Sequence, residues 1–107
     1  FRDTLSRAEL EDCVVPVLAR SELAAQTIAG PISFVFIDGG HSMPAAMADY
    51  RNWAARVIAD GMLAIHDVFP DPADGGRPPF EIYQLALRSG LFEEIEAVHS
   101  LRLLRRL

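Results

Sequence analysis

One apolar stretch that ends abruptly in polar and small residues constrains this fold more than any other feature. The segment ISFVFIDGGHS, residues 32–42, is apolar except for one serine until it reaches Asp38, two glycines and His41. An apolar run bounded by turn residues is typical of a strand buried on both faces, as in a parallel sheet under helices. In open α/β sheets, ligands bind at the carboxyl ends of the strands. Asp38 and His41 therefore stand where a ligand would bind.

A second apolar run repeats the pattern further along the chain. The segment MLAIHDVF, residues 62–69, carries His66 and Asp67 near its end. The residues between the two runs predict a helix, because Pro44 suits a first helical turn and Gly61 a helix end. A strand, a helix and a second strand form a βαβ unit, which is almost always right-handed. We therefore expect both strands to deliver acid and imidazole groups to one edge of the sheet.

The helix predicted from Pro44 to Asp60 has two distinct faces. Its apolar residues recur at spacings of four, three and four, which is the period of a helix that packs against a core. This apolar stripe consists of Ala46, Tyr50, Trp53 and Val57. The polar residues fall on the opposite, solvent-facing side, and they are Asp49, Asn52, Arg56 and Asp60.

The remaining elements are predicted from periodicity and from turn residues. The expected helices are residues 2–10, residues 21–28 with Ser21 as the N-cap, and residues 80–89; the expected strands are residues 13–18, 92–98 and 101–107. The last two strands form a hairpin with its turn at His99 and Ser100. The polar segment between them and the βαβ unit, residues 71–79, is interpreted either as a lid or as a plain surface connection.

Composition excludes several classes of partner. The net charge is −5, and a nucleic-acid-binding domain usually carries a basic patch or excess, so we expect no nucleic acid partner. No apolar run approaches the roughly 20 residues that span a bilayer. The single cysteine, Cys13, allows no intrachain disulfide and indicates a reducing compartment, which predicts a cytoplasmic protein.

The chain begins at Phe1 in a helical pattern, which suggests a piece of a longer protein.

The polar residues at the two strand ends allow three interpretations. The first is a divalent metal site formed by Asp38, His66 and Asp67, because carboxylates suit magnesium, calcium or manganese and imidazole admits a transition metal. The second is acid–base chemistry by His41 or His66. The third is structural, with Asp38 stabilising the following turn or helix and the histidines bonded to the backbone.

Two motifs carry a resemblance to a known family. Ile37-Asp38-Gly39-Gly40-His41-Ser42, followed by Asp49, Trp53 and Gly61, and then by Ile65-His66-Asp67-Val68, is similar to class I S-adenosylmethionine-dependent methyltransferases. The similarity is to the bacterial branch whose fourth strand ends in I-D-G-x-H and whose fifth is followed by His-Asp. It extends to residues 7–18 and 92–107, and therefore covers nearly the whole chain.

The resemblance implies a fold and a set of roles. The fold is a three-layer Rossmann-like sheet, mostly parallel with an antiparallel C-terminal hairpin, and residues 1–107 are the C-terminal part of one methyltransferase domain without its first strands and glycine-rich loop. The resemblance assigns Ser21, Asp38 and Gly39 to S-adenosylmethionine, and His41 and Asp38 to catalysis. Asp38, His66 and Asp67 would hold Mg²⁺ or another divalent cation.

The implied reaction is transfer of a methyl group to a hydroxyl of a small molecule or sugar, with metal assistance as an option. The alternative from another class is a non-catalytic Rossmann-like module for dimerisation, for example as a homodimer, or for partner binding. A third hypothesis is a metal-dependent enzyme on this scaffold that does not methylate. A strand and glycine-rich loop encoded upstream of Phe1 would favour the methyltransferase.

Overall fold

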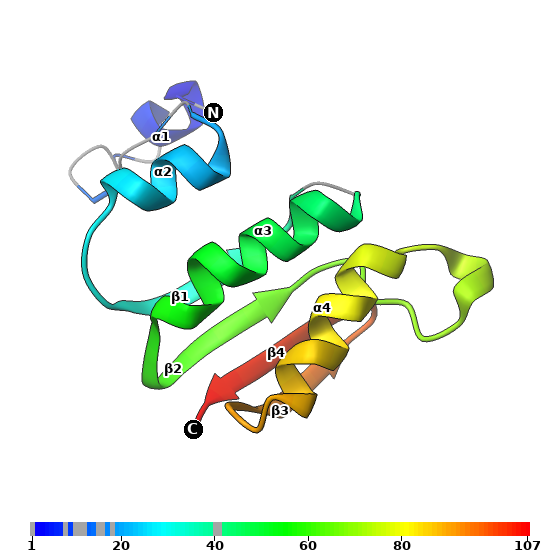
Figure 1. The fold of residues 1–107 in the computed structure, drawn as a ribbon. Helices are drawn as coiled ribbons and strands as arrows, with labels where there is room; N and C mark the ends of the chain where they lie inside the picture. The colour runs from blue at the N-terminus through cyan, green and yellow to red at the C-terminus, as the bar shows by residue number, and fades with distance from the viewer. Residues whose placement is uncertain (1, 8, 10–12, 15–16, 18, 40–41) are drawn as a thin grey trace.

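The computed structural model describes residues 2–7, 9, 13–14, 17, 19–39 and 42–107. In these residues, a four-stranded mixed sheet is covered on one face by two long helices (Figure 1). The helices are α1 (Arg2–Arg7), α2 (Ser21–Thr27), α3 (Met43–Trp53) and α4 (Arg77–Arg88). The strands are β1 (Ile32–Ile37), β2 (Val57–Ile65), β3 (Phe92–Val98) and β4 (Leu101–Arg106), with short 3₁₀ turns η1 (Ala54–Arg56) and η2 (Pro72–Asp74). None of the described helices combines the length and the apolar composition needed to span a bilayer.

The strands lie in the order β1-β2-β4-β3. β1 and β2 are parallel, whereas β4 runs antiparallel to both β2 and β3. The predicted βαβ unit and the C-terminal hairpin are therefore confirmed. The prediction of a mostly parallel sheet is wrong for the described residues, because β4 inserts between β2 and β3 and makes two of the three pairings antiparallel.

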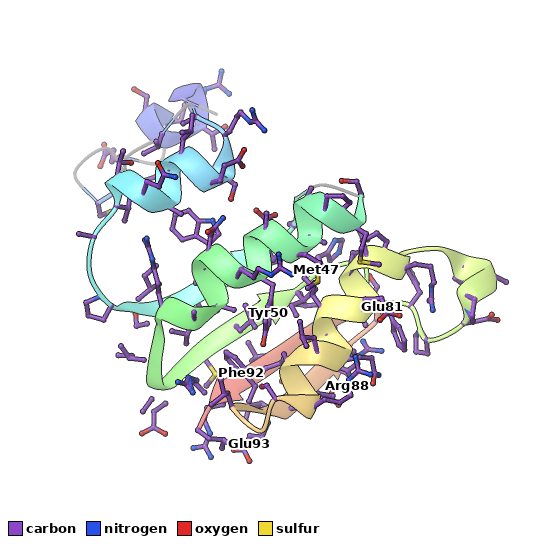
Figure 2. The ribbon with its side chains drawn as sticks, viewed as in Figure 1. Met47, Tyr50, Glu81, Arg88, Phe92 and Glu93 are labelled. Carbon is purple, nitrogen blue, oxygen red and sulfur yellow. The ribbon has the colours of Figure 1, made fainter. Side chains whose placement is uncertain are left out.

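The core lies between the sheet and helices α3 and α4. Leu63, Ile65 and Leu104 from the strands and Ile82 from α4 are completely buried. Met47 and Tyr50 of α3 and Phe92 at the start of β3 lie around this core, where the two helices approach the sheet (Figure 2). Of the predicted stripe of α3, Ala46 and Tyr50 pack against this core, whereas Trp53 lies outside it and Val57 belongs to β2.

The opposite face of the sheet is open in the part of the chain that the structure describes. Phe34 is 55% exposed and Phe36 is 52% exposed, although both lie on β1, which was expected to be buried on both faces. Helices α3 and α4 cover the other face, and α2 contacts α3 rather than forming a layer beneath the strands (Figure 1). The predicted third layer is thus not observed among the described residues.

The helix after β1 ends earlier than the sequence pattern predicts. Ser42 is its N-cap, since the Ser42 hydroxyl accepts a hydrogen bond from the Ala45 amide at 3.2 Å, and Pro44 lies in the first turn as expected. The helix stops at Trp53, and strand β2 begins at Val57 rather than at Met62. Val57 pairs with Ile32 and is only 3% exposed. Strand pairing and burial of Val57 therefore outweigh the helical tendency of the preceding alanines.

Three further predictions need correction. The N-cap of α2 is Arg20, and Ser21 is its first residue. Helix α4 begins at Arg77, which shortens the predicted loop of residues 71–79, and the loop itself contains a 3₁₀ turn. The predicted strand at residues 13–18 lies partly outside the described residues, and its described members, Cys13, Val14 and Val17, belong to no strand.

Helix α4 is tied to the C-terminal hairpin by a polar contact. The hydroxyl of Tyr83 donates a hydrogen bond to Glu94 Oε1 at 2.5 Å, and the Arg102 guanidinium lies over the Tyr83 ring at 5.8 Å. Burial raises the pKa of Tyr83, and the hydrogen bond and charge of Glu94 raise this pKa further, against an opposing effect of Arg102. Tyr83 therefore remains protonated at neutral pH and keeps its role as the donor.

Candidate functional site

The carboxyl ends of β1 and β2 lie side by side. Ile37 pairs with Ile65, and the His66 amide donates a hydrogen bond to the Ile37 carbonyl at 3.1 Å. The residues that follow, Asp38 on one strand and His66 with Asp67 on the other, therefore meet at one edge of the sheet. This convergence was predicted from sequence, because parallel neighbours that end in register place their next residues together.

Asp38, His66 and Asp67 form a compact polar cluster. His66 Nδ1 lies 3.0 Å from Asp38 Oδ1 and 3.2 Å from Asp67 Oδ1. One potential ligand atom from each residue lies within 4.8 Å of the other two. The side chains are 52%, 42% and 31% exposed for Asp38, His66 and Asp67. The cluster is therefore reachable from solvent while its three donor groups already converge.

The backbone and one aromatic ring fix the orientation of this cluster. Asp67 has a φ of 62°, the left-handed region that side-chain-bearing residues adopt at a cost. Val68 next to it is completely buried, and its amide donates to the Ser100 carbonyl at 2.8 Å. On the open face of the sheet, the Phe36 ring lies edge-on to the His66 imidazole, with ring centroids 6.4 Å apart. The backbone at Asp67 and Val68 and the Phe36 ring of β1 therefore both support the cluster.

The donor set matches the needs of a divalent cation. At metal–ligand distances of 2.0–2.1 Å, neighbouring ligands of an octahedral Mg²⁺ lie about 3 Å apart. The two nitrogen–oxygen distances in the cluster have this size. Two carboxylates and one imidazole suit a hard cation that also tolerates nitrogen, such as Mg²⁺ or Mn²⁺. His66 Nδ1 lies within hydrogen-bond distance of both carboxylates, and a bound cation would lie between the same three groups.

A cavity of about 580 Å³ adjoins the cluster along β1. Its walls come from β1, from the residues just after it, and from α2 and α3. The lining residues are Ser21, Ile32, Phe34, Val35, Phe36, Ile37, Asp38, Gly39, Asp49 and Trp53. This volume falls in the range of small-molecule sites, which combine apolar and aromatic walls with a few polar groups. All three predicted cofactor residues, Ser21, Asp38 and Gly39, line this cavity.

Asp38 and Gly39 also line the small space beside His66 and Asp67. The cavity and the polar cluster therefore meet at the end of β1. The predicted base, His41, lies outside the described residues.

Two side chains of α3 that line the cavity were interpreted differently from sequence. Asp49 was placed on the solvent face, yet a Cβ on Gly39 would lie 3.1 Å from its Oδ2 atom, so this carboxylate borders the backbone after β1. Trp53 was assigned to the core stripe. A signal was available, because Asp49 precedes Trp53 by four residues and both therefore share one side of the helix.

Trp53 of α3 and Arg56 of η1 both bind α2, and the contact of Trp53 with Ser21 forms one side of the cavity. The Trp53 indole Nε1 donates to Ser21 Oγ at 2.7 Å. The Arg56 guanidinium donates to the Ile28 carbonyl at 2.6 Å and to the Ala25 carbonyl, both near the C-terminal end of α2. Arg56 was expected on the solvent face of a longer helix. The early end of α3 places it against α2 instead.

We expect Trp53→Phe and Ser21→Ala each to lower the free energy of unfolding by about 1 kcal/mol, because each removes one half of the same hydrogen bond. In a domain of this size, such a loss lowers Tm by roughly 4–8 °C. The double variant should lose less than the sum of the two single losses, because the bond can be lost only once. Thermal unfolding of the four proteins measures this coupling, and strictly additive losses would contradict the bond.

Comparisons with known proteins identify a family and a similar fold. A family model described as "Methyltransferase domain" matches residues 1–68. The chain is also similar to a crystal structure from Clostridium thermocellum, whose own description reads "putative rRNA-methylase", with a TM-score of 0.67 and 14% sequence identity. The aligned region covers 98% of this chain and 67% of that one. At this identity the structural match supports the fold alone, whereas the family model spans more than half of the sequence. The chain belongs to the methyltransferase domain family.

Proposed function

We propose that this chain is part of an S-adenosylmethionine-dependent O-methyltransferase that acts on a hydroxyl of a small molecule or sugar, with a cavity for the methyl donor beside a cation site for the acceptor. Membership of the methyltransferase domain family implies S-adenosylmethionine as the methyl donor. The single observation that carries the finer proposal is the meeting of two features at Asp38. This residue lines the cavity of about 580 Å³ and also belongs to the cluster with His66 and Asp67.

The cavity has the chemistry that this donor requires. Phe34, Phe36 and Trp53 offer aromatic surface for a flat purine, and Asp38 and Asp49 offer carboxylate oxygens to hydroxyl and ammonium groups. Gly39, without a side chain, lets the Asp49 carboxylate lie beside the backbone after β1. Ser21 contributes its hydroxyl, which already accepts a bond from Trp53. These residues are the ones proposed to bind S-adenosylmethionine.

The cluster supplies what the acceptor needs. Methyl transfer from a sulfonium to oxygen breaks the sulfur–carbon bond, whose electrons stay on sulfur, and the hydroxyl must give up its proton. A cation held by Asp38, His66 and Asp67 would lower the pKa of an acceptor hydroxyl bound to it. The two carboxylates would balance the charge of such a cation at the end of the cavity. His41, four residues from the end of β1, remains the predicted acceptor of the proton.

The charge distribution favours a small acceptor over RNA, which is the substrate class in the printed description of the similar crystal structure. The chain has a net charge of −5. On the C-terminal hairpin, Arg105 is paired with Glu93 and Asp60, and Arg102 lies 4.0 Å from Glu94. These arginines are therefore largely neutralised by neighbouring acids, whereas RNA-binding surfaces need uncompensated positive charge.

A second candidate function, the non-catalytic module, is favoured by the open face of the sheet. Phe34 and Phe36 are more than half exposed, and β1 is an edge strand in the described sheet. Such a face is suited to a second copy of the chain or to another partner. Sedimentation of the full-length protein with and without Phe36→Ser measures this, since a dimer built on this face would dissociate in the variant.

Calorimetric titration of S-adenosylmethionine into the full-length protein, with and without Mg²⁺, tests the methyltransferase proposal. We expect a Kd below about 1 mM, within the range common for enzyme substrates. Adenosine, which lacks the charged methionine part, is the matched control ligand and should bind more weakly. Absence of heat from a folded protein would exclude methyl-donor binding. A parallel titration with a short RNA should give no heat of binding. Tight RNA binding would overturn the small-molecule assignment.

A further inference from the structure

The loop after Asp67 folds back onto the backbone of Asp67. Gly76 has a φ of 64°, and a Cβ at this position would lie 2.4 Å from the Asp67 carbonyl oxygen and 2.6 Å from the Phe69 ring. The start of helix α4 therefore sits directly against the residue that supplies one of the three donor groups. Pro79 and Ile82 of α4 also line the small space beside His66 and Asp67. The position of α4 and the position of Asp67 are consequently linked.

Arg77, the first residue of α4, closes this loop. Its Nε and Nη2 atoms both lie 3.1 Å from the Gly75 carbonyl oxygen, and Nη2 also donates to the carbonyls of Phe69 and, at 3.3 Å, Asp71. The guanidinium stacks over the Phe80 ring at 4.6 Å. One side chain therefore binds the beginning and the end of the loop and anchors both to the partly buried Phe80.

We propose that Arg77 is a positioning residue for the cation site, acting through the loop on Asp67; this inference rests on the proposed metal role of Asp38, His66 and Asp67. Asp67 has the left-handed φ of 62°, which aspartate adopts more readily than most residues but which contacts on both sides of it stabilise. Buried Val68, bonded to Ser100, anchors the chain on one side of Asp67. On the other side, the backbone of Gly76, which precedes Arg77, lies so close to the Asp67 carbonyl that it leaves no room for a Cβ.

The guanidinium is the group that this role requires. Arginine offers five donors in a rigid planar fork and stacks on an aromatic ring, whereas lysine offers a single flexible ammonium group. A lysine at position 77 would keep the charge and reach some of the three carbonyls, but it would not stack on Phe80 as a plane. We therefore expect Arg77→Lys to keep the fold and part of the positioning effect.

Mn²⁺ binding to the full-length protein, followed by electron paramagnetic resonance of free Mn²⁺, tests the proposal. We expect Arg77→Ala to weaken Mn²⁺ affinity about 10-fold, the lower end of the effect of residues that orient metal ligands, and Arg77→Lys to have an intermediate affinity. Arg88→Ala is the matched control. Arg88 is an exposed arginine near the other end of α4, with no polar side-chain contact shown in the described part of the chain (Figure 2). The Mn²⁺ affinity of Arg88→Ala should equal that of the wild type.

Hydrogen exchange of the metal-free proteins tests whether Arg77 holds the loop, independently of whether the site binds a metal. In Arg77→Ala, amides of residues 67–76 should exchange at least about 10-fold faster, while those of β2 and β4 stay protected. Wild-type protein that binds no Mn²⁺ would refute the metal role, and this exchange pattern would still decide whether Arg77 holds the loop. Equal Mn²⁺ affinity and equal exchange in Arg77→Ala and Arg88→Ala would overturn the positioning role. If Arg77→Ala does not fold, Arg77→Lys decides by the same two measurements.

Discussion

Asp38→Asn is expected to weaken Mn²⁺ or Mg²⁺ binding more than 100-fold, and Asp67→Asn to do the same. Residues that merely orient metal ligands cost about 10–100-fold when replaced, so loss of a directly bound carboxylate should exceed that range. An amide has the shape of a carboxylate without its charge, so each substitution leaves only a neutral, weaker oxygen ligand and changes the packing little. The oxygens of both side chains lie close to His66 Nδ1, at 3.0 Å and 3.2 Å.

Isothermal titration with Mn²⁺ measures this effect, and Asp74→Asn is the matched control. Asp74 is an exposed carboxylate in η2, outside the cluster. Its replacement by asparagine changes the net charge by the same amount as each cluster substitution. If Asp74→Asn weakened binding as much as Asp38→Asn, the cation would be attracted by general charge rather than held by the cluster. Unchanged affinity in both cluster variants would remove the metal site and leave the fold unaffected.

Gly61→Ala is expected to have the largest effect on stability. A Cβ at Gly61 would lie 2.8 Å from Val57 Cγ1 and 2.9 Å from the carbonyl oxygens of Ile58 and Ser33. Two of these atoms belong to backbone within β2 and β1, and the buried Val57 has little room to move. Overpacking of a closed site costs typically 1–3 kcal/mol, and here three contacts are violated together. We expect a loss of about 3 kcal/mol or more, a large share of the stability of a typical domain.

Thermal unfolding followed by circular dichroism should show Tm lowered by more than roughly 10 °C, since about 1 kcal/mol corresponds to 4–8 °C in small domains. Gly90→Ala is the control for the loss of a glycine. Gly90 has a φ of 76°, but a Cβ added there would meet no atom within 4 Å, so only backbone strain of about 1–2 kcal/mol applies. A Tm for Gly61→Ala equal to or above that of Gly90→Ala would contradict the close approach of β1 and β2 at this glycine.

The position of Gly61 illustrates a limit of sequence patterns. Between Ile32 and Phe34 the register of β1 against β2 shifts, and the extra residues of β2 bulge around Asp60, whose φ is 66°. In the sequence, Gly61 resembles the end of a helix, because glycine is common after helices. A glycine is also required where two backbones approach so closely that no Cβ fits between them. Only the pairing of the strands separates these two explanations.

Asp49 and Trp53, the two α3 residues beside the cavity, are a second example of this limit. Helical spacing places Asp49 next to Trp53, but it does not say which neighbour faces that side of the helix. In the fold, α2 and the end of β1 both lie there, so Asp49 borders Gly39 and Trp53 bonds to Ser21. A polar residue on a helix is expected in solvent until a second element is known to approach it.

The sequence by itself determined the parts that depend on local periodicity and chain direction. The apolar run ending at Asp38, the hairpin after Phe92 and the meeting of Asp38 with His66 and Asp67 all follow from strand length, turn residues and the parallel order of a βαβ unit. Tertiary structure alone decided where α3 stops, which face of the sheet is covered and how Arg77 reaches back to the loop after Asp67. These features depend on contacts between residues far apart in the chain or on competition between two local preferences, and burial and backbone pairing resolve that competition only in the folded chain.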